Sequence, residues 1–210
     1  MKFIKPQMSI IKKSKIHLYT NPIVGIVYWS RLKGVFNYLK KKRCGLTLEI
    51  GCKYGFFLPS LCQISDKVIG SDIGSTFDSC EKITLKEIQK RYANLELKKA
   101  DARRLSNYID ESSCDVIVAI SVLEHIDDHN GAIKEIRQCL KPDGIFVCVL
   151  PSENWLYKLA RILVGCRGYC HKHYDLERLQ ANLRKNFREV KKWNCPFGIP
   201  LFFTGIYERK

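Results

Sequence analysis

Acidic and glycine residues recur where successive apolar segments of the sequence end. The first segment runs into the turn Glu49-Ile50-Gly51-Cys52-Lys53-Tyr54-Gly55, which precedes a helical stretch. Gly51 and Gly55 would let the backbone approach a ligand closely, and the amino end of the next helix would favour an anionic group. Taken alone, two glycines are a weak signal, because tight turns need glycine for their own geometry.

Two aspartates repeat this pattern further along the chain. Asp72 ends the next apolar segment, 21 residues after Gly51, where a carboxylate can accept hydrogen bonds from ribose hydroxyls. Asp101 follows the third segment and could accept a hydrogen bond from an adenine amino group. Each aspartate could instead be a helix cap or a turn residue. Three such features at three successive segment ends nevertheless indicate one shared ligand site.

The elements that must position these residues alternate between strand and helix. Strands are predicted at 46–50, 68–72, 95–98, 116–121 and 145–150, and helices at 56–63, 85–92 and 131–140. This alternation favours a parallel sheet built from right-handed βαβ units. The tail predicts a helix at 176–186 capped by Asp175, followed by an antiparallel strand pair at 189–193 and 201–207.

The positive charge of the chain is concentrated in its first 43 residues. The net charge is +15, and residues 1–43 hold eleven Lys or Arg and no acidic residue. Asn21-Pro22 predicts a helix start, and apolar residues then recur at helical spacing as far as Leu39. We therefore divide the chain into a basic N-terminal arm with an amphipathic helix, residues 1–43, and a domain, residues 44–210.

This helix has three interpretations. We favour a helix that packs over the ligand site with a solvated basic face. Contact with an anionic membrane surface comes second, and a phosphate-rich partner is a further alternative. No secretory signal is apparent, and the ten cysteines are scattered, with Cys148 inside an apolar run typical of a core thiol. We expect a reducing cytoplasmic setting, with peripheral membrane contact as an addition.

Several stretches, in order, resemble the motifs of class I S-adenosylmethionine-dependent methyltransferases. These are LEIGCKYGFFLPSL, VIGSDI, KKADARRL, and CDVIVAISVLEHIDD followed by CLKPDGIFVCVLP, the last two typical of the type 11 methyltransferase family. The resemblance spans residues 46 to about 151. It implies an α/β, Rossmann-like doubly wound, mostly parallel sheet with a C-terminal antiparallel strand pair, and a methyltransferase domain over residues 44–210.

The resemblance also implies the cofactor, S-adenosylmethionine, with S-adenosylhomocysteine as product. The first turn would hold its methionine end, Asp72 the ribose, Asp101 with Ala102 the adenine, and Ser121 with Glu124 the floor near the sulfonium. The cofactor-binding residues implied in this way are Glu49, Gly51, Cys52, Gly55, Asp72, Ile73, Asp101, Ala102, Ser121 and Glu124.

We expect an acceptor that is a small molecule, a sugar or a lipid-like compound, methylated at oxygen. An oxygen acceptor needs a base, and His125 is the candidate, although it could equally pack the pocket or cap a helix. The stretch Ser121-Val122-Leu123-Glu124 lacks the Asn/Asp-Pro-Pro-aromatic pattern of nucleic-acid amino methyltransferases, so nucleic acid is not the expected partner. Cys166, Cys170, His171 and His173 fit no common zinc spacing, and no metal is expected. The family resemblance instead places this region over the acceptor, where His171, His173 and Tyr174 could contact it.

One residue departs from the family pattern. Lys53 occupies a position where relatives usually carry glycine, and its side chain is compatible with a cationic sulfonium only if it points to solvent. Lys53 could instead reach an acidic acceptor, or it could mean that cofactor affinity is lost. A catalytically silent methyltransferase-like binding protein is therefore an alternative. A nicotinamide-dependent oxidoreductase is less favoured, because the turn lacks the third glycine of G-x-G-x-x-G.

Overall fold

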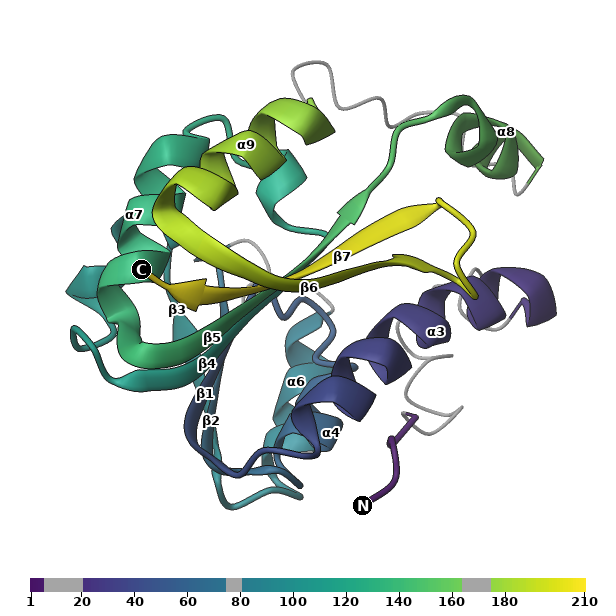
Figure 1. Cartoon of the computed structure of the whole chain (residues 1–210). Coiled ribbons are helices and arrows are strands. Elements are labelled where there is room, and N and C mark those ends of the chain that lie inside the picture. Colours follow the sequence, from purple (N-terminus) through teal and green to yellow (C-terminus); the bar gives the residue numbers. More distant parts are fainter. Residues whose placement is uncertain (6–20, 75–80, 164–174) are drawn as a thin grey trace.

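The computed structural model describes residues 1–5, 21–74, 81–163 and 175–210, which form one seven-stranded sheet with helices on both faces (Figure 1). The strand order is β3-β2-β1-β4-β5-β7-β6. The strands are β1 (Cys44–Ile50), β2 (Ser65–Asp72), β3 (Leu95–Lys99), β4 (Cys114–Ile120), β5 (Leu140–Pro151), β6 (Phe187–Cys195) and β7 (Phe202–Arg209).

The pairing of the strands confirms the predicted fold class. The first five strands are parallel, and β7 pairs antiparallel with both β5 and β6. β1 lies in the middle, with β2 on one side and β4 on the other. The strand order therefore reverses beside β1, and ligands of such sheets bind at the carboxyl ends of the strands flanking that reversal.

The helices form the two outer layers of the fold. α3 (Pro22–Leu39), α4 (Leu58–Leu61) and α6 (Glu81–Gln89) cover one face, while η1 (Ala102–Asn107), α7 (His129–Cys139) and α9 (Leu176–Asn186) cover the other (Figure 1). η2 (Leu123–His125) follows β4, and α8 (Trp155–Leu163) follows β5 with none of its residues buried.

The predicted helices exist, although some of their ends differ from the prediction. α9 matches the predicted range, and the side chain of Asp175 accepts from Arg178 N as its cap. α7 begins two residues early because Asp128 caps it by accepting from Gly131 N at 2.9 Å. The helix predicted at 56–63 is reduced to four residues, all buried, since β2 begins soon afterwards at Ser65.

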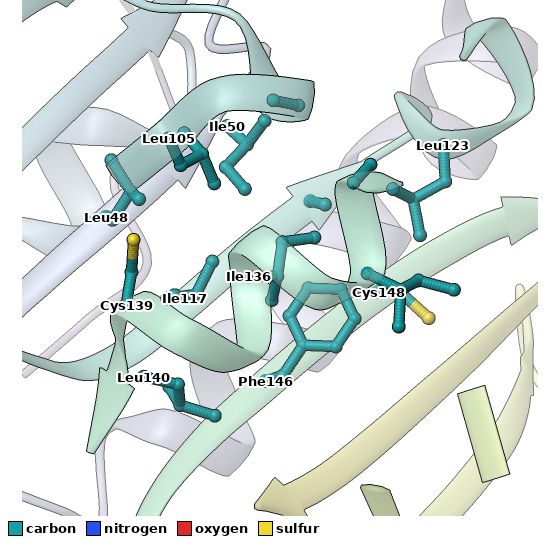
Figure 2. Packing of buried hydrophobic residues seen from close by; sticks show 14 of the residues in the cluster. Leu48, Ile50, Leu105, Ile117, Leu123, Ile136, Cys139, Leu140, Phe146 and Cys148 are labelled. Carbon is teal, nitrogen blue, oxygen red and sulfur yellow. The ribbon is translucent and has the colours of Figure 1, made fainter. Parts of the chain in front are cut away.

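Each face of the sheet has its own apolar core. Figure 2 shows the face under α7, where Ile136 and Cys139 pack with strand residues that include Ile117, Phe146 and Cys148. Cys148 is fully buried, as expected for a core thiol.

On the opposite face, α3 is an integral part of the core. Leu32, Phe36 and Leu39 are at most 2% exposed and cluster with strand residues such as Val147. Val24 N donates to Asn21 Oδ1 at 3.1 Å, the cap that the Asn-Pro pair predicts. None of the helices in the described ranges is long and apolar enough to cross a membrane.

Candidate cofactor and acceptor site

The turn after β1 requires its two glycines. Gly51 and Gly55 both have a φ of +69°, in the left-handed region that side chains disfavour. A Cβ added to Gly51 would lie only 2.3 Å from Cγ2 of Val122, which follows β4. The glycine therefore lets the β1 and β4 loops approach each other at the carboxyl edge of the sheet.

Lys53 also adopts a left-handed conformation, with a φ of +45°. A side chain at this position costs little only where φ is negative, and because φ is positive here a non-glycine residue costs about 1–2 kcal/mol. The residue is exposed, and its Nζ lies 5.4 Å from the ring centroid of Tyr54.

Asp72 ends β2 and organises this turn through both carboxylate oxygens. Its Oδ2 accepts from Lys53 N and its Oδ1 from Ile73 N, each at 2.8 Å. Because each carboxylate oxygen has a second lone pair, the group can still accept from the hydroxyls of a ligand. Ile73 is 55% exposed next to it, so an apolar surface adjoins the carboxylate.

Glu49 and Cys52 are the buried members of the first turn. Glu49 is 5% exposed, and its Oε2 has no hydrogen-bond partner among the described residues. Burial, with a smaller contribution from Asp72, raises the pKa of Glu49 to about 8. Burial also raises the pKa of the Cys52 thiol, which favours a neutral thiol. An unpartnered buried carboxyl at a strand end is suited to a cationic group of a ligand.

Asp101 lies after β3, where the third predicted position falls, but its carboxylate is already engaged. It caps η1 by accepting from Arg103 N at 2.9 Å, and it also binds the Arg103 guanidinium at 2.6 Å. The hydrogen bonds from Arg103 lower the pKa of Asp101. The cap expected as an alternative is thus present, and an adenine amino group would compete with Arg103. Ala102 beside it is buried.

Ser121 and Glu124 follow β4, and Arg31 of α3 lies beside them. Arg31 Nη1 donates to Ser121 Oγ at 2.7 Å. Burial raises the pKa of Glu124 to about 8, an effect that the Arg31 charge and a hydrogen bond with Ser121 partly offset. Oε2 of Glu124 has no hydrogen-bond partner among the described residues.

The segment after β5 adds further buried polar atoms to this corner. Ser152 Oγ and Glu153 Oε1 have no hydrogen-bond partner in the part of the chain that the structure describes. Glu153 has a φ of +50°, and Ser121 has a φ of +55°. Burial and the nearby Glu153 raise the pKa of Tyr157 in α8 to about 12. Strained backbone and unpartnered polar groups commonly gather at functional sites.

His125 does not share this buried corner. It is exposed at the end of η2, one residue beyond the buried Glu124. Its predicted role as a base is untested by this arrangement. Cys166, Cys170, His171, His173 and Tyr174 lie outside the described residues.

Sequence patterns missed Arg31, Ser152, Glu153 and Tyr157. A signal existed for Arg31, because it falls on the apolar stripe of its helix, four residues from both Val27 and Val35. A cation inside such a stripe is unusual and indicates a buried partner. Glu153 and Tyr157 come near Glu124 only through the tertiary fold, and no local pattern marked them or Ser152.

Comparison with known proteins identifies a methyltransferase domain in the chain. The sequence model of the family described as methyltransferase domain matches residues 48–148. A probable S-adenosylmethionine-dependent methyltransferase of Mycolicibacterium smegmatis is 26% identical over 128 residues, 60% of this chain and 46% of that protein. A ubiquinone biosynthesis O-methyltransferase of Pelagibacter ubique is 30% identical over 114 residues, 54% of this chain and 45% of that protein.

Solved structures with a similar fold are also methyltransferases. The crystal structure of the N-methyltransferase NodS of Bradyrhizobium japonicum, in complex with S-adenosylhomocysteine, matches with a TM-score of 0.67 at 18% identity, over 96% of each chain. Residues 48–148 are thus similar to the methyltransferase domain family, and the relatives named here include an S-adenosylmethionine-dependent methyltransferase. The cofactor named for that relative is S-adenosylmethionine. The chain spans less than half the length of the two sequence relatives.

Replacing Lys53 by glycine tests whether this residue impairs the turn. The variant Lys53→Gly should change S-adenosylmethionine affinity by less than about tenfold, because the side chain is exposed and its contact in the turn is with the ring of Tyr54. Its free energy of unfolding should rise by at most about 1 kcal/mol, since relief of the left-handed strain is offset by a more flexible unfolded chain. Isothermal calorimetry and urea denaturation measure the two quantities. A much larger gain in affinity would favour the silent binding protein.

Proposed function

We propose that this protein transfers a methyl group from S-adenosylmethionine to an oxygen atom of a small-molecule, sugar or lipid-like acceptor. One observation carries the proposal: the unpartnered Glu49 carboxyl and the Asp72 carboxylate lie at the carboxyl ends of neighbouring strands, beside a turn with two left-handed glycines. The names of the ubiquinone biosynthesis relatives support an oxygen acceptor.

The residues present fit the cofactor. Glu49 would hold the amino group of its methionine end, Asp72 its ribose hydroxyls, and exposed Ile73 would pack against the adenine. When bound, S-adenosylmethionine supplies an already activated methyl group. The chain must then hold an acceptor oxygen in line with that group and exclude water, and such positioning can contribute several kcal/mol.

Calorimetric titration tests the proposal directly. S-adenosylmethionine should bind and NAD should not, and the reverse result would identify a nicotinamide enzyme. Binding of the first should also release up to about one proton near neutral pH. Glu49, with a pKa of about 8, is then largely protonated, and the arriving ammonium group favours its ionised form. Titration in buffers of different ionisation enthalpy measures this release.

Glu49→Gln provides the control for proton release. Glutamine keeps the size of the side chain but cannot ionise, so S-adenosylmethionine should still bind, more weakly, without releasing that proton. Equal release from the Glu49→Gln variant and the native protein would contradict the placement of the amino group at Glu49.

We also propose peripheral contact with an anionic membrane. The basic residues of the arm support it, as does the surface of α8, where Trp155 is 74% exposed and Leu163 78% exposed. The protein should sediment with vesicles containing phosphatidylserine at low salt, and binding should weaken at high salt because the Debye length shortens. The double variant Trp155→Ser/Leu163→Ser should bind less. Absence of binding at low salt would contradict the proposal.

A further inference from the structure

A buried guanidinium lies beside Ser121 and Glu124, which follow β4, and no motif or relative assigns it a role. Arg31 is 5% exposed, and its Nε has no hydrogen-bond partner among the described residues. Guanidinium keeps its charge at all ordinary pH values, and a buried charge is costly unless it is paired. Within the described ranges no carboxylate lies at ion-pair distance from it. The guanidinium thus retains a buried donor, Nε, that makes no hydrogen bond among the described residues.

Aromatic rings fix the orientation of this group. The Arg31 Cζ lies 4.5 Å from the ring centroid of Tyr28 and 4.1 Å from that of Phe202, the first residue of β7. Tyr157 packs edge-on against Phe202 at 5.4 Å. Because stacking and the bond to Ser121 hold the planar fork in place, little rotamer entropy is lost when it binds a further oxygen.

The fixed charge of Arg31 itself favours an anionic ligand over a cationic one. Glu124, from η2, has a pKa of about 8 because it is buried, so near neutral pH it is largely protonated and can donate a hydrogen bond. The carboxyl group of Glu153, from the segment after β5, also raises the pKa of Glu124 and that of Tyr157. A protonated amine would meet the fixed positive charge of Arg31, whereas an oxyanion would find two donors.

We propose that Arg31 binds the nucleophilic oxygen of the acceptor in its anionic form, which makes the acceptor a phenol, an enol or a carboxylic acid. The inference rests on the proposed function and narrows its substrate class. The acceptor would lose its proton to solvent before methylation, and Arg31 would stabilise the resulting oxyanion. No side-chain base is then required, in keeping with the exposed position of His125.

Matched probes distinguish an acidic oxygen from a neutral one. The full-length protein, saturated with S-adenosylhomocysteine, is titrated near neutral pH with 4-nitrophenol, 4-nitrobenzoate, 4-nitrobenzyl alcohol and 4-nitrobenzylamine. The two acidic probes should bind at least about tenfold more tightly than the alcohol and the amine. The visible absorbance of bound 4-nitrophenol should also shift toward its anion, corresponding to a lowering of its apparent pKa by about one unit, or tenfold.

Two variants on α3 show whether Arg31 causes the preference. Arg31→Met keeps most of the side-chain volume and should abolish both the preference and the absorbance shift. Lys33→Met removes an exposed charge from the same helix and should leave both unchanged. The inference would be overturned if the acidic probes bind no more tightly than the neutral alcohol and the amine. It would also be overturned if the preference for acidic probes is unaltered in Arg31→Met. The proposed function fails separately, if S-adenosylhomocysteine and S-adenosylmethionine do not bind.

Discussion

Replacing Phe36 by alanine should lower the free energy of unfolding by about 3–5 kcal/mol. The ring is fully buried near the carboxyl end of α3, its centroid lies 6.0 Å from that of Phe3, and it belongs to the core cluster beneath the helix. Removing it leaves a cavity that surrounding side chains can fill only in part. Urea denaturation followed by circular dichroism measures the change.

The neighbouring residue offers a control for Phe36→Ala. Asn37 is exposed on the same helix, so Asn37→Ala should change stability by no more than about 0.5 kcal/mol. Similar small effects for both variants would mean that α3 behaves as a detachable arm. Phe36→Leu, which removes less volume, should fall between the two if the helix is part of the core.

Replacing Asp72 by alanine should weaken S-adenosylmethionine binding by roughly 10- to 150-fold, or about 1.5–3 kcal/mol, through lost charge-assisted hydrogen bonds. The carboxylate also accepts from Lys53 N and Ile73 N, so its removal frees the turn that would surround the cofactor. Both effects act in the same direction. Calorimetry on the folded variant measures the loss.

A second aspartate of the same strand controls for Asp72→Ala. Asp66 lies near the opposite end of β2 in an exposed pair with Arg43 at 3.3 Å, and Asp66→Ala should leave cofactor affinity unchanged. Asp72→Asn keeps one acceptor oxygen and should lose less affinity than alanine. Unaltered affinity in a folded Asp72→Ala protein would overturn the ribose role of this residue.

The sequence predicted most of the sheet, because its signals are local. The segment ending at Asp72 is a short apolar run beside turn residues, and the observed β2 includes the predicted strand. The start of α9 was predictable because Asp175 marks it. The end of α4 was not, since the onset of β2 rather than a capping residue ends that helix.

The residues of the turn after β1 were more predictable from sequence than the buried polar residues around Arg31. Gly51 and Asp72 belong to motifs only a few residues long, which can be recognised in the sequence without knowledge of the fold. The conformation of Lys53 was not accessible, because a sequence carries no φ. Arg31 and Glu153 lie more than a hundred residues apart in sequence, and only tertiary packing places both near Glu124.

Arg31 and the aromatic ring of Phe202 that packs on it lie in parts of the sequence outside the methyltransferase domain match. The family match spans residues 48–148, whereas Arg31 and Phe202 lie outside it, toward opposite ends of the sequence. The residues proposed to bind the cofactor and those proposed to select the acceptor can therefore change independently in evolution. In chimeras that exchange only the segments flanking residues 48–148 between relatives, the preferred acceptor should change with those segments. The affinity for S-adenosylmethionine should stay the same.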